Sequence, residues 1–344
     1  MKFLVVGCGS IGRRHLRNLA ALGERDLMGV DPDPERREAA GKESGARPFA
    51  AFDEELAQRA DVVFVTLPSA LHLDVALTAA RAGCHLFIEK PLACAWEGVD
   101  ELIELVRSRG LTGFVGSNWK FHPAFGRMKG LLNGGAIGRV LTARFLFGQY
   151  LPDWHPWEDY RRTYSARKSL GGGVIFDSHE LDYAGWLLGP VEELTCSAAR
   201  VSNLEIETED VASLLLRFRS GAVAQIQLDY LHRNYTRRYE FCGTEGTVVW
   251  DVNTRAVELY QAAEEKWRRW EIPRSYEGNT MYLEEVRHFL NCLNGRENPL
   301  TPLERGREVL ELMLAAHRSS REKRTVSLRP LAEAEAHNRI AEVR

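Results

Sequence analysis

Short apolar runs recur through the first 116 residues, and helical segments separate them. The runs cover residues 2–6, 27–31, 62–67, 85–88 and 111–116. Helices are expected within 7–23, which opens with a glycine turn, and near 33–44, 69–82 and 97–109. Apolar strands that alternate with helices at this spacing are typical of βαβ units, which build a parallel sheet covered on both faces. Residues 1–120 are therefore predicted to form a doubly wound α/β Rossmann domain.

A glycine motif follows the first apolar run. Gly7, Gly9 and Gly12 match GxGxxG between a predicted strand and a predicted helix. The first glycine allows a tight turn, the second lets the backbone approach a pyrophosphate, and the third brings helix and strand together. Backbone N–H groups at the helix start, at Ser10 and Ile11, would bind the phosphates. The alternative is a glycine turn that binds no nucleotide.

An acidic residue, Asp31, ends the second apolar run, about 20 residues after the glycine motif. Its carboxylate would accept hydrogen bonds from the ribose hydroxyls and would repel a 2′-phosphate. NAD is therefore predicted as the cofactor, and NADP is less favoured. Arg13 and Arg14 keep NADP open, because either guanidinium could screen a phosphate.

Polar residues stand where two of the predicted strands end. Glu89-Lys90 follows the run at 85–88 and precedes Pro91, while Thr66 and Pro68 stand at the end of the run at 62–67. Ligands of open parallel sheets bind outside the carboxyl ends of the strands, so Lys90 is expected near the nicotinamide. Burial there would let the lysine lose its proton more easily. Thr66, Pro68 and Glu89 are expected to border the nicotinamide ribose and ring.

That lysine has a plain alternative, a solvent-facing side chain at a strand end. Pro91 restricts Lys90 to an extended conformation, which would help to aim the side chain. The sequence leaves open whether the Lys90–Pro91 peptide bond is cis.

Several segments together resemble the Gfo/Idh/MocA family of NAD(P)-dependent oxidoreductases. In the family's order they are GCGSIGRRH near the start, TLPSALH (66–72), IEKPLA (88–93), NWKFHP (118–123), LGGGVIFDSHELDYAGWLLG (170–189) and LEEVRHFLNCLNG (283–295). The resemblance implies that residues 121–344 form an α+β domain with a large, mostly antiparallel open sheet that mediates oligomer contacts. It also implies hydride transfer at a sugar or polyol carbon, with Lys90 near the reacting oxygen. We include His72 and Asn118, which lie in these motifs, among the expected cofactor-binding residues.

Alternating patterns in the second half support an α+β domain independently of the family. Residues 210–219 and 222–230 alternate apolar and polar side chains around Ser220-Gly221, which predicts a hairpin. Residues 239–242 and 247–251 predict a second hairpin. Helices are expected near 279–295 and 303–319.

Another candidate for proton transfer is His179. A histidine that titrates near neutrality can exchange a proton with a substrate hydroxyl, and the resemblance carries the family's histidine onto His179 through the matching HxxD. His179 and Asp182 are three residues apart, so on a helix they would share a face. The alternative is a histidine hydrogen-bonded in a domain interface.

One position departs from the family pattern. Many members have an aspartate three or four residues before this histidine, whereas Asp177 stands two residues before His179. Asp177 to Glu180 also fits a capping box, with Asp177 as N-cap and Glu180 reaching back. Asp177 is therefore either a catalytic residue or a helix cap, and in the second case Asp182 would orient His179.

The segment 150–168 is dense in aromatic residues and arginines and lacks periodicity. Aromatic rings would stack on the C–H faces of a sugar, and guanidinium groups would hold a carboxylate or a phosphate. Trp157, Tyr160, Arg161 and Arg162 are the substrate-binding candidates here, together with Lys90 and His179. A packed loop with solvated charges is the alternative.

Composition narrows the function classes further. A net charge of −3 gives no reason to expect nucleic acid or an anionic membrane as a partner. No apolar run approaches the roughly 20 residues of a membrane helix, and the start of the chain does not read as a signal peptide. The six scattered cysteines show no metal-binding spacing, which predicts reduced thiols, no metal site and a cytoplasmic location.

We therefore expect an NAD-dependent dehydrogenase for a sugar, sugar acid, polyol or nucleotide-sugar, assembled as a homodimer or homotetramer. Two other classes share this fold. One keeps NAD bound and recycles it during elimination, epimerisation or glycoside cleavage, and the other is an inactive nucleotide-sensing regulator. The presence of Lys90 and His179 argues against a regulator.

Overall fold

The computed structural model describes residues 1–177 and 179–328, which form two compact units. The first unit comprises residues 1–126, 161–179 and 273–311, and the described part of the second comprises residues 127–160, 180–272 and 312–328. The domain boundary predicted after residue 120 lies near the end of the first stretch. The two later stretches of the first unit come from the part of the chain that the sequence assigns to the second domain.

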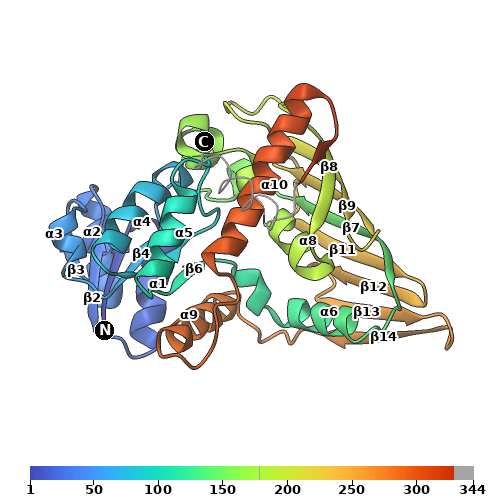
Figure 1. The fold of residues 1–344 in the computed structure, drawn as a ribbon, viewed down its shortest axis with the longest axis horizontal. Coiled ribbons are helices and arrows are strands. Elements are labelled where there is room, and N and C mark those ends of the chain that lie inside the picture. Colours follow the sequence, from blue (N-terminus) through green and yellow to red (C-terminus); the bar gives the residue numbers. More distant parts are fainter. Residues whose placement is uncertain (178, 329–344) are drawn as a thin grey trace, which may run out of the picture. The chain divides into compact units, whose positions relative to one another are not determined.

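The first unit contains a six-stranded parallel sheet with strand order β3-β2-β1-β4-β5-β6 (Figure 1). Its strands are β1 (Lys2–Val6), β2 (Asp26–Val30), β3 (Arg47–Phe49), β4 (Val62–Val65), β5 (His85–Ile88) and β6 (Gly113–Val115). The intervening helices are α1 (Ser10–Ala21), α2 (Pro34–Ser44), α3 (Glu54–Ala57), α4 (His72–Arg81) and α5 (Val99–Ser108). The predicted Rossmann domain is confirmed. Only β3 and α3 have no counterpart in the predicted series.

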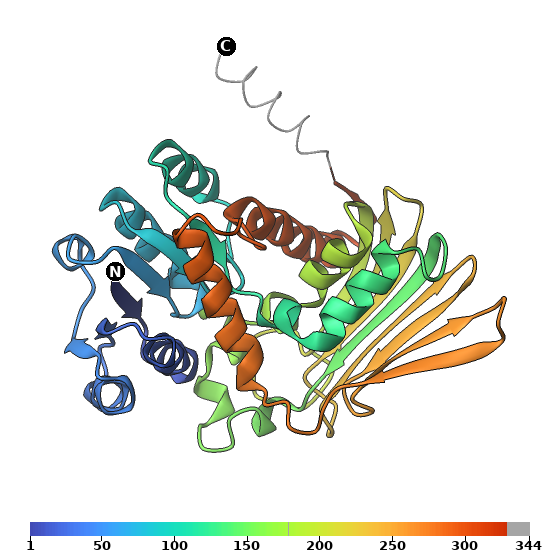
Figure 2. The same ribbon diagram turned by 90° about the horizontal axis from the view of Figure 1, so that it is seen from below.

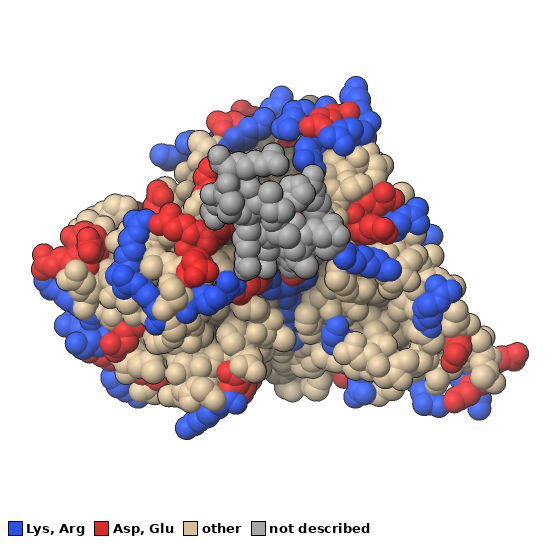
Figure 3. All heavy atoms as spheres, in the orientation of Figure 1, with Lys and Arg blue, Asp and Glu red and all other residues tan. Residues whose placement is uncertain are grey.

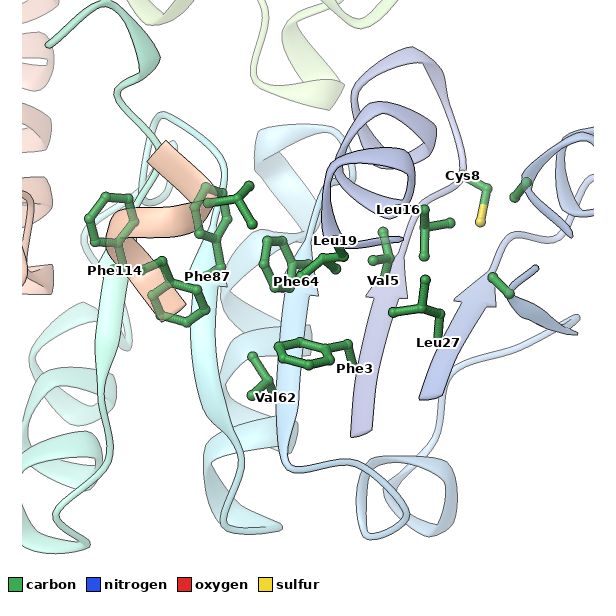
Figure 4. Close-up of a cluster of buried hydrophobic side chains, with 14 residues drawn as sticks. Phe3, Val5, Cys8, Leu16, Leu19, Leu27, Val62, Phe64, Phe87 and Phe114 are labelled. Atoms are coloured by element: carbon green, nitrogen blue, oxygen red, sulfur yellow. The ribbon is translucent and has the colours of Figure 1, made fainter. Parts of the chain in front are cut away.

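Aromatic side chains form the core beneath this sheet (Figure 4). Phe64 and Phe87 stack with ring centroids 4.6 Å apart, and Phe114 stacks on Phe87 at 5.2 Å. Helix α9 (Asn279–Leu293) adds Phe289, whose ring meets Phe87 edge-on at 5.4 Å. Burial of this ring explains why a segment far along the chain belongs to the first unit.

The second unit contains a nine-stranded sheet with order β14-β13-β12-β11-β7-β10-β9-β8-β15. Its strands are β7 (Val140–Gly148), β8 (Val191–Ala199), β9 (Val211–Phe218), β10 (Val223–Asp229), β11 (Thr236–Gly243), β12 (Gly246–Asp251), β13 (Ala256–Gln261), β14 (Lys266–Glu271) and β15 (Val326–Ser327). All neighbours are antiparallel except β7 and β10, which run parallel. The predicted mostly antiparallel sheet and both predicted hairpins, β9–β10 and β11–β12, are confirmed.

Helices α6 (Pro123–Asn133) and α8 (Glu180–Leu188) lie over one face of this sheet (Figure 2). Strand β9 alternates accordingly, with Leu214 and Leu216 buried while Leu215 between them is 49% exposed. Trp267, on strand β14, is 58% exposed. Such exposed apolar side chains are compatible with the predicted oligomer contacts, which stay a prediction.

The long helix α10 (Leu303–Glu322) follows α9 in sequence, close to the predicted bounds. Acidic and basic side chains are interspersed over the face shown in Figure 3. Within residues 1–177 and 179–328, no helix combines the length and the apolar character needed to cross a bilayer. The cytoplasmic location stays a prediction.

Candidate active site

The glycine loop after β1 is packed against the end of β4. Gly7 has φ +101°, and a Cβ built on it would lie 2.8 Å from the carbonyl oxygen of Thr66. A Cβ on Gly12 would lie only 1.8 Å from the Gly7 carbonyl oxygen. The hydroxyl of Thr66 lies 2.7 Å from that same oxygen and 2.9 Å from the Val6 carbonyl oxygen, so it fixes the loop from below. Two of the three motif glycines are thus required by close packing.

Gly9 is different, because its surroundings are open. Within residues 1–177 and 179–328, and apart from adjoining backbone, no heavy atom lies within 4 Å of a Cβ built on Gly9, which is the N-cap of α1. No side chain caps α1, and its first turn carries no acidic residue. The N–H groups at Ser10 and Ile11 therefore lack helical partners and face an open approach. This arrangement fits the pyrophosphate of a dinucleotide.

Asp31 stands just past β2 and is only 4% exposed. Its Oδ2 accepts the N–H of Cys8 at 2.9 Å, and its Oδ1 accepts the N–H of Asp33 at 2.9 Å. Each carboxylate oxygen keeps a further lone pair for a hydroxyl donor. The carboxylate is therefore fixed beside the glycine loop and fits the predicted role at the ribose.

The two arginines that left NADP open both have partners. Arg13 pairs with Glu43 at 3.0 Å, and the Arg14 guanidinium lies 4.3 Å from the ring centroid of Tyr282. Because both guanidinium groups already contact other side chains, neither has to bind a 2′-phosphate. This supports the predicted preference for NAD.

Asn118 and His72 differ in what they can offer a cofactor. Asn118 follows β6, is 5% exposed, and its Nδ2 has no partner among the residues that the structure describes. A buried amide with an unused donor fits a ligand contact. His72 is 1% exposed, and its ring nitrogens lie 2.8 Å from the Pro91 carbonyl oxygen and 2.7 Å from that of Leu67. His72 therefore connects the segments that follow β4 and β5. Its effect on the cofactor would come through these segments and not through direct contact.

Lys90 stands two residues beyond β5, and its bond to Pro91 is cis. Its Nζ lies 3.2 Å from Oδ1 of Asp177 and also donates to the Asp177 backbone carbonyl. The Lys90 side chain is 20% exposed, whereas that of Asp177 is 1% exposed. The picture of a solvent-facing lysine is therefore wrong. Lys90 is a partly buried cation that contacts the carboxylate of Asp177 and keeps some exposure to solvent.

Glu89, the residue before Lys90, contacts a histidine that was not among the predicted site residues. His15 is fully buried on α1, and its Nε2 lies 2.7 Å from Oε1 of Glu89. Burial raises the pKa of Glu89, but the hydrogen bond and charge of His15, with the charge of Lys90, outweigh burial and hold the pKa below its usual range. Glu89 is thus an ionised group under Lys90. A histidine on the buried stripe of an amphipathic helix was the available signal.

A second carboxyl group was also missed. Glu285 on α9 is 1% exposed and accepts the backbone N–H of Ser117. Burial and the nearby charge of Glu89 raise the pKa of Glu285 well above its ordinary value. A Cβ built on Gly116 would lie 3.2 Å from the Glu89 carboxylate. Glu89 is thus beside Gly116, and Glu285 is beside the next residue, Ser117. Because neighbouring like charges repel, Glu285 holds a proton while Glu89 is ionised.

The predicted capping box is wrong. Asp177 is the last residue of the short helix α7 (Val174–Asp177), and α8 begins at Glu180. Glu180 is therefore the first residue of α8 and not the third, as a box with Asp177 as N-cap requires. Its Oε1 accepts the Tyr239 hydroxyl at 2.8 Å and lies 2.9 Å from Nε of Arg237. Ser178 lies outside the described residues.

His179 is half-buried and lies immediately before α8. Asp182, 9% exposed, is in the first turn of that helix. His179 precedes the helix, so the two residues do not lie within one helix, and a shared face stays a prediction. A catalytic role of His179 stays a prediction, as does its orientation by Asp182.

The substrate-binding candidates lie in irregular backbone, as predicted. Residues 151–170 contain four short 3₁₀ turns, η3 (Leu151–Asp153), η4 (Tyr160–Arg162), η5 (Tyr164–Ala166) and η6 (Lys168–Leu170). Trp157 is 71% exposed, the Tyr160 hydroxyl accepts the N–H of Glu205 at 3.3 Å, and Arg161 and Arg162 are exposed. Trp157 and Tyr160 belong to the second unit and the two arginines to the first.

Two family models match successive parts of the chain. The oxidoreductase family model with an NAD-binding Rossmann fold matches residues 1–117. The GFO/IDH/MocA C-terminal domain matches residues 125–249. These matches correspond to the parallel sheet and to a large part of the antiparallel sheet.

Named proteins are similar over most of their length. Myo-inositol 2-dehydrogenase of Thermotoga maritima is 29% identical over 341 residues, which cover 95% of this chain and 98% of that protein. The dTDP-3,4-didehydro-2,6-dideoxy-alpha-D-glucose 3-reductase of Streptomyces violaceoruber is 31% identical over 257 residues, 72% of this chain and 71% of that protein. The crystal structure of the WlbA dehydrogenase from Bordetella pertussis, in complex with NADH and UDP-GlcNAcA, has a TM-score of 0.81 and 27% identity. It covers 96% of this chain and 99% of that chain.

Sequence and fold therefore agree along almost the whole chain. The dinucleotide loop, the acidic residue after β2 and the second sheet all correspond to the resemblance drawn from the sequence. The chain belongs to the Gfo/Idh/MocA family of NAD-dependent oxidoreductases.

Proposed function

We propose that this protein transfers a hydride between NAD and a hydroxyl-bearing carbon of a sugar, sugar acid, polyol or nucleotide-sugar. The observation that carries the proposal is the Lys90–Asp177 pair, with Nζ 3.2 Å from Oδ1, at the carboxyl end of β5. Reacting groups of parallel sheets lie at this edge. Lys90 keeps access to solvent, so its ammonium can meet a substrate from that side.

Oxidation of an alcohol removes a hydride and a proton, and NAD supplies the hydride acceptor. A Lys ammonium has three N–H donors, and Asp177 takes two of those of Lys90 through Oδ1 and the carbonyl oxygen. The third donor would hold the substrate hydroxyl oxygen. His179 would exchange the proton of that hydroxyl, a role that suits a group titrating near neutrality.

The cofactor would be held by groups of the first unit. Gly9 and the N–H groups at the start of α1 would bind the pyrophosphate, and Asp31 would bind the adenosine ribose. Asn118 would donate its unused amide N–H. Thr66, Pro68 and Glu89, at the ends of β4 and β5, would border the nicotinamide ribose and ring.

The substrate class rests on chemistry and on the relatives. Their names refer to an inositol, a dTDP-linked sugar and UDP-GlcNAcA, so ring-shaped polyols and nucleotide-sugars are the first candidates. The exposed Arg161 and Arg162 would recognise a carboxylate or a diphosphate. Trp157 and Tyr160 would contact a sugar ring.

The test measures NADH formation across inositols, sugars, sugar acids and nucleotide-sugars, with NAD and with NADP. Turnover of one class with NAD by the wild type, lost in Lys90→Met, would support the proposal. Silence across the panel, with NAD co-purifying in the protein, would instead favour an enzyme that recycles its cofactor. Unchanged turnover in Lys90→Met would rule out the role assigned to the lysine.

A further inference from the structure

The carboxylate of Asp177 is held by more than Lys90. The Tyr164 hydroxyl donates to Oδ1 at 2.5 Å, and the Ser165 hydroxyl donates to Oδ2 at 2.6 Å. Ser165 is 2% exposed, and the Asp177 side chain is 1% exposed. Two adjacent residues of η5 therefore donate hydrogen bonds to the two carboxylate oxygens of Asp177, and Lys90 contacts Oδ1.

We propose that Tyr164 and Ser165 are positioning residues of the reaction: they fix the Asp177 carboxylate and, through it, the Nζ of Lys90. The inference rests on the proposed function for its link to catalysis. Hydrogen bonds to a charged group are shorter and stronger than neutral ones, so two of them define one orientation of the carboxylate. A lysine has a flexible stem, and without a fixed partner its ammonium would sample many positions.

The alternative role for Tyr164, a proton-transferring acid or base, conflicts with its surroundings. Burial and the negative charge of Asp177 raise the pKa of Tyr164 well above its ordinary value. The negative charges of Asp177 and Glu89 both raise the pKa of this hydroxyl. Tyr164 therefore stays protonated at physiological pH and acts as a hydrogen-bond donor.

The backbone around these residues is built to hold them. A Cβ on Gly172 would lie 2.1 Å from the Tyr164 carbonyl oxygen and 2.6 Å from that of Ser165, so only glycine allows this approach. The N–H of Gly173 donates to the Ser165 carbonyl at 3.1 Å. These contacts press η5 against the start of α7, which ends on Asp177. The glycine run 171–173 thus allows the close packing that places Tyr164 and Ser165 beside Asp177, the partner of Lys90.

A second contact fastens the same loop to the sheet. The hydroxyl of Ser69, just beyond β4, donates to the carbonyl oxygen of Gly171 at 3.1 Å. A Cβ on Gly171 would lie 2.2 Å from that hydroxyl. The loop that positions Asp177 is therefore tied to β4 through Ser69 and meets β5 through Lys90. Both ties lie within the first unit.

The experiment compares Tyr164→Phe and Ser165→Ala with two matched controls, Tyr260→Phe on β13 and Ser44→Ala on α2. With the substrate found in the panel, we expect kcat to fall about 10- to 100-fold in the first two variants. The dissociation constant of NADH and the unfolding temperature should stay near those of the wild type. The controls should keep the wild-type kcat.

Two readouts separate positioning from general damage. Tyr164→Phe and Ser165→Ala should lower kcat while the KM for the substrate stays near the wild-type value, because each variant removes the orientation of a reacting group and no substrate contact. In an Asp177→Asn background, Tyr164→Phe should cause little further loss, because the group that it positions is already changed.

A measurement without turnover keeps this inference distinct from the proposed function. The rate of acetylation of Lys90 at a fixed pH, followed by peptide mass spectrometry, reports how firmly Asp177 holds its amine. In Tyr164→Phe the weakened pair should let Lys90 react faster than in the wild type. If the acetylation rate, kcat and KM all match the wild type in both variants, the positioning role is wrong. Faster acetylation of Lys90 in a protein without redox turnover would retain the inference and reject the proposed function.

Discussion

Lys90 Nζ and Asp177 Oδ1 lie 3.2 Å apart although 87 residues separate them in sequence. One residue follows a strand of the parallel sheet, and the other ends the short helix α7. Their meeting joins the two motifs in which the sequence suggested catalysis. Asp177 ends α7, whereas His179, two residues later, lies just before α8.

This pair predicts a loss of turnover without a loss of cofactor binding. Lys90→Met and Asp177→Asn should each lower kcat by about 10²- to 10⁴-fold, the range of a lost acid–base or positioning group. Neither residue belongs to the glycine loop, so NADH titration by fluorescence should give a near wild-type dissociation constant. Lys42→Met, which removes an exposed lysine on α2, is the control. Weakened NADH binding of similar size in all three variants would contradict the assignment.

Gly9 and Gly12 predict opposite effects of the same added methyl group. Gly9→Ala has an allowed φ of −67° and no neighbour within 4 Å, so the fold should tolerate it. The methyl group would stand where a pyrophosphate approaches, so NAD affinity should fall about tenfold or more. Gly12→Ala places a Cβ 1.8 Å from the Gly7 carbonyl and should lower the unfolding temperature. Thermal unfolding and NADH titration of both variants check this prediction. An unchanged NAD affinity in Gly9→Ala would show that the pyrophosphate does not bind beside Gly9.

Asp31 predicts the choice between the two cofactors. Asp31→Asn keeps an oxygen acceptor but removes the negative charge that repels a 2′-phosphate. We expect the NAD dissociation constant to rise about tenfold and that of NADP to fall. Titration of both cofactors against wild type and variant measures the ratio. A wild type that binds NADP as tightly as NAD would show that Asp31 does not discriminate.

The local parts of this fold could be predicted from the sequence. A buried strand in a parallel sheet is a continuous apolar run, and a glycine motif between strand and helix has one common use. Ser220-Gly221 likewise predicted the β9–β10 hairpin, whose register pairs Val223 with Arg217. Each of these signals lies within a few residues of the element that it predicts.

The remaining parts depend on contacts between distant segments. Tyr164 and Ser165 stood in a loop rich in aromatic residues, and nothing local marked them as partners of Asp177. Phe289 looked like an ordinary helix residue, yet it completes the core of the first unit. The prediction of a capping box was wrong because the residues next to Asp177 in sequence are compatible with either the end or the start of a helix. Such choices are decided by tertiary packing and not by local sequence.

The buried ion pair of the second unit predicts a large effect on stability. Arg237 and Glu180 have side chains that are 3% and 0% exposed, with Nε 2.9 Å from Oε1. Burial would lower the pKa of Arg237, but the adjacent charge of Glu180 raises it, so Arg237 stays charged. Arg237→Met should cost about 3–5 kcal/mol, because it leaves a buried carboxylate without its cation.

Urea unfolding of Arg237→Met, of the double variant Glu180→Gln/Arg237→Met, and of a surface control tests this prediction. The double variant should recover part of the loss, since the remaining buried group is neutral. Arg59→Met, which breaks an exposed pair with Glu55, should cost at most about 1 kcal/mol. Equal losses for the buried and the exposed pair would show that burial does not control the energy.

The carboxyl pair on either side of the Gly116–Ser117 turn predicts a pH dependence of stability. Burial and the charge of Glu89 raise the pKa of Glu285 well above about 4.3, and Lys120 opposes this shift without cancelling it. The folded state therefore keeps a proton that the unfolded state releases, so this group's contribution is full below about pH 4.3 and falls as pH rises. The expected slope reaches about −1.4 kcal/mol per pH unit until the folded pKa is passed.

Glu285→Gln should remove this slope, because the amide keeps an acceptor for the Ser117 N–H and has no proton to lose. Urea unfolding at pH 5, 6, 7 and 8 should show that the variant gains stability relative to the wild type as the pH rises. Glu284→Gln, on the exposed side of α9, is the matched control and should follow the wild-type curve. A constant difference between Glu285→Gln and wild type across this range would mean that Glu285 is ionised in the folded protein.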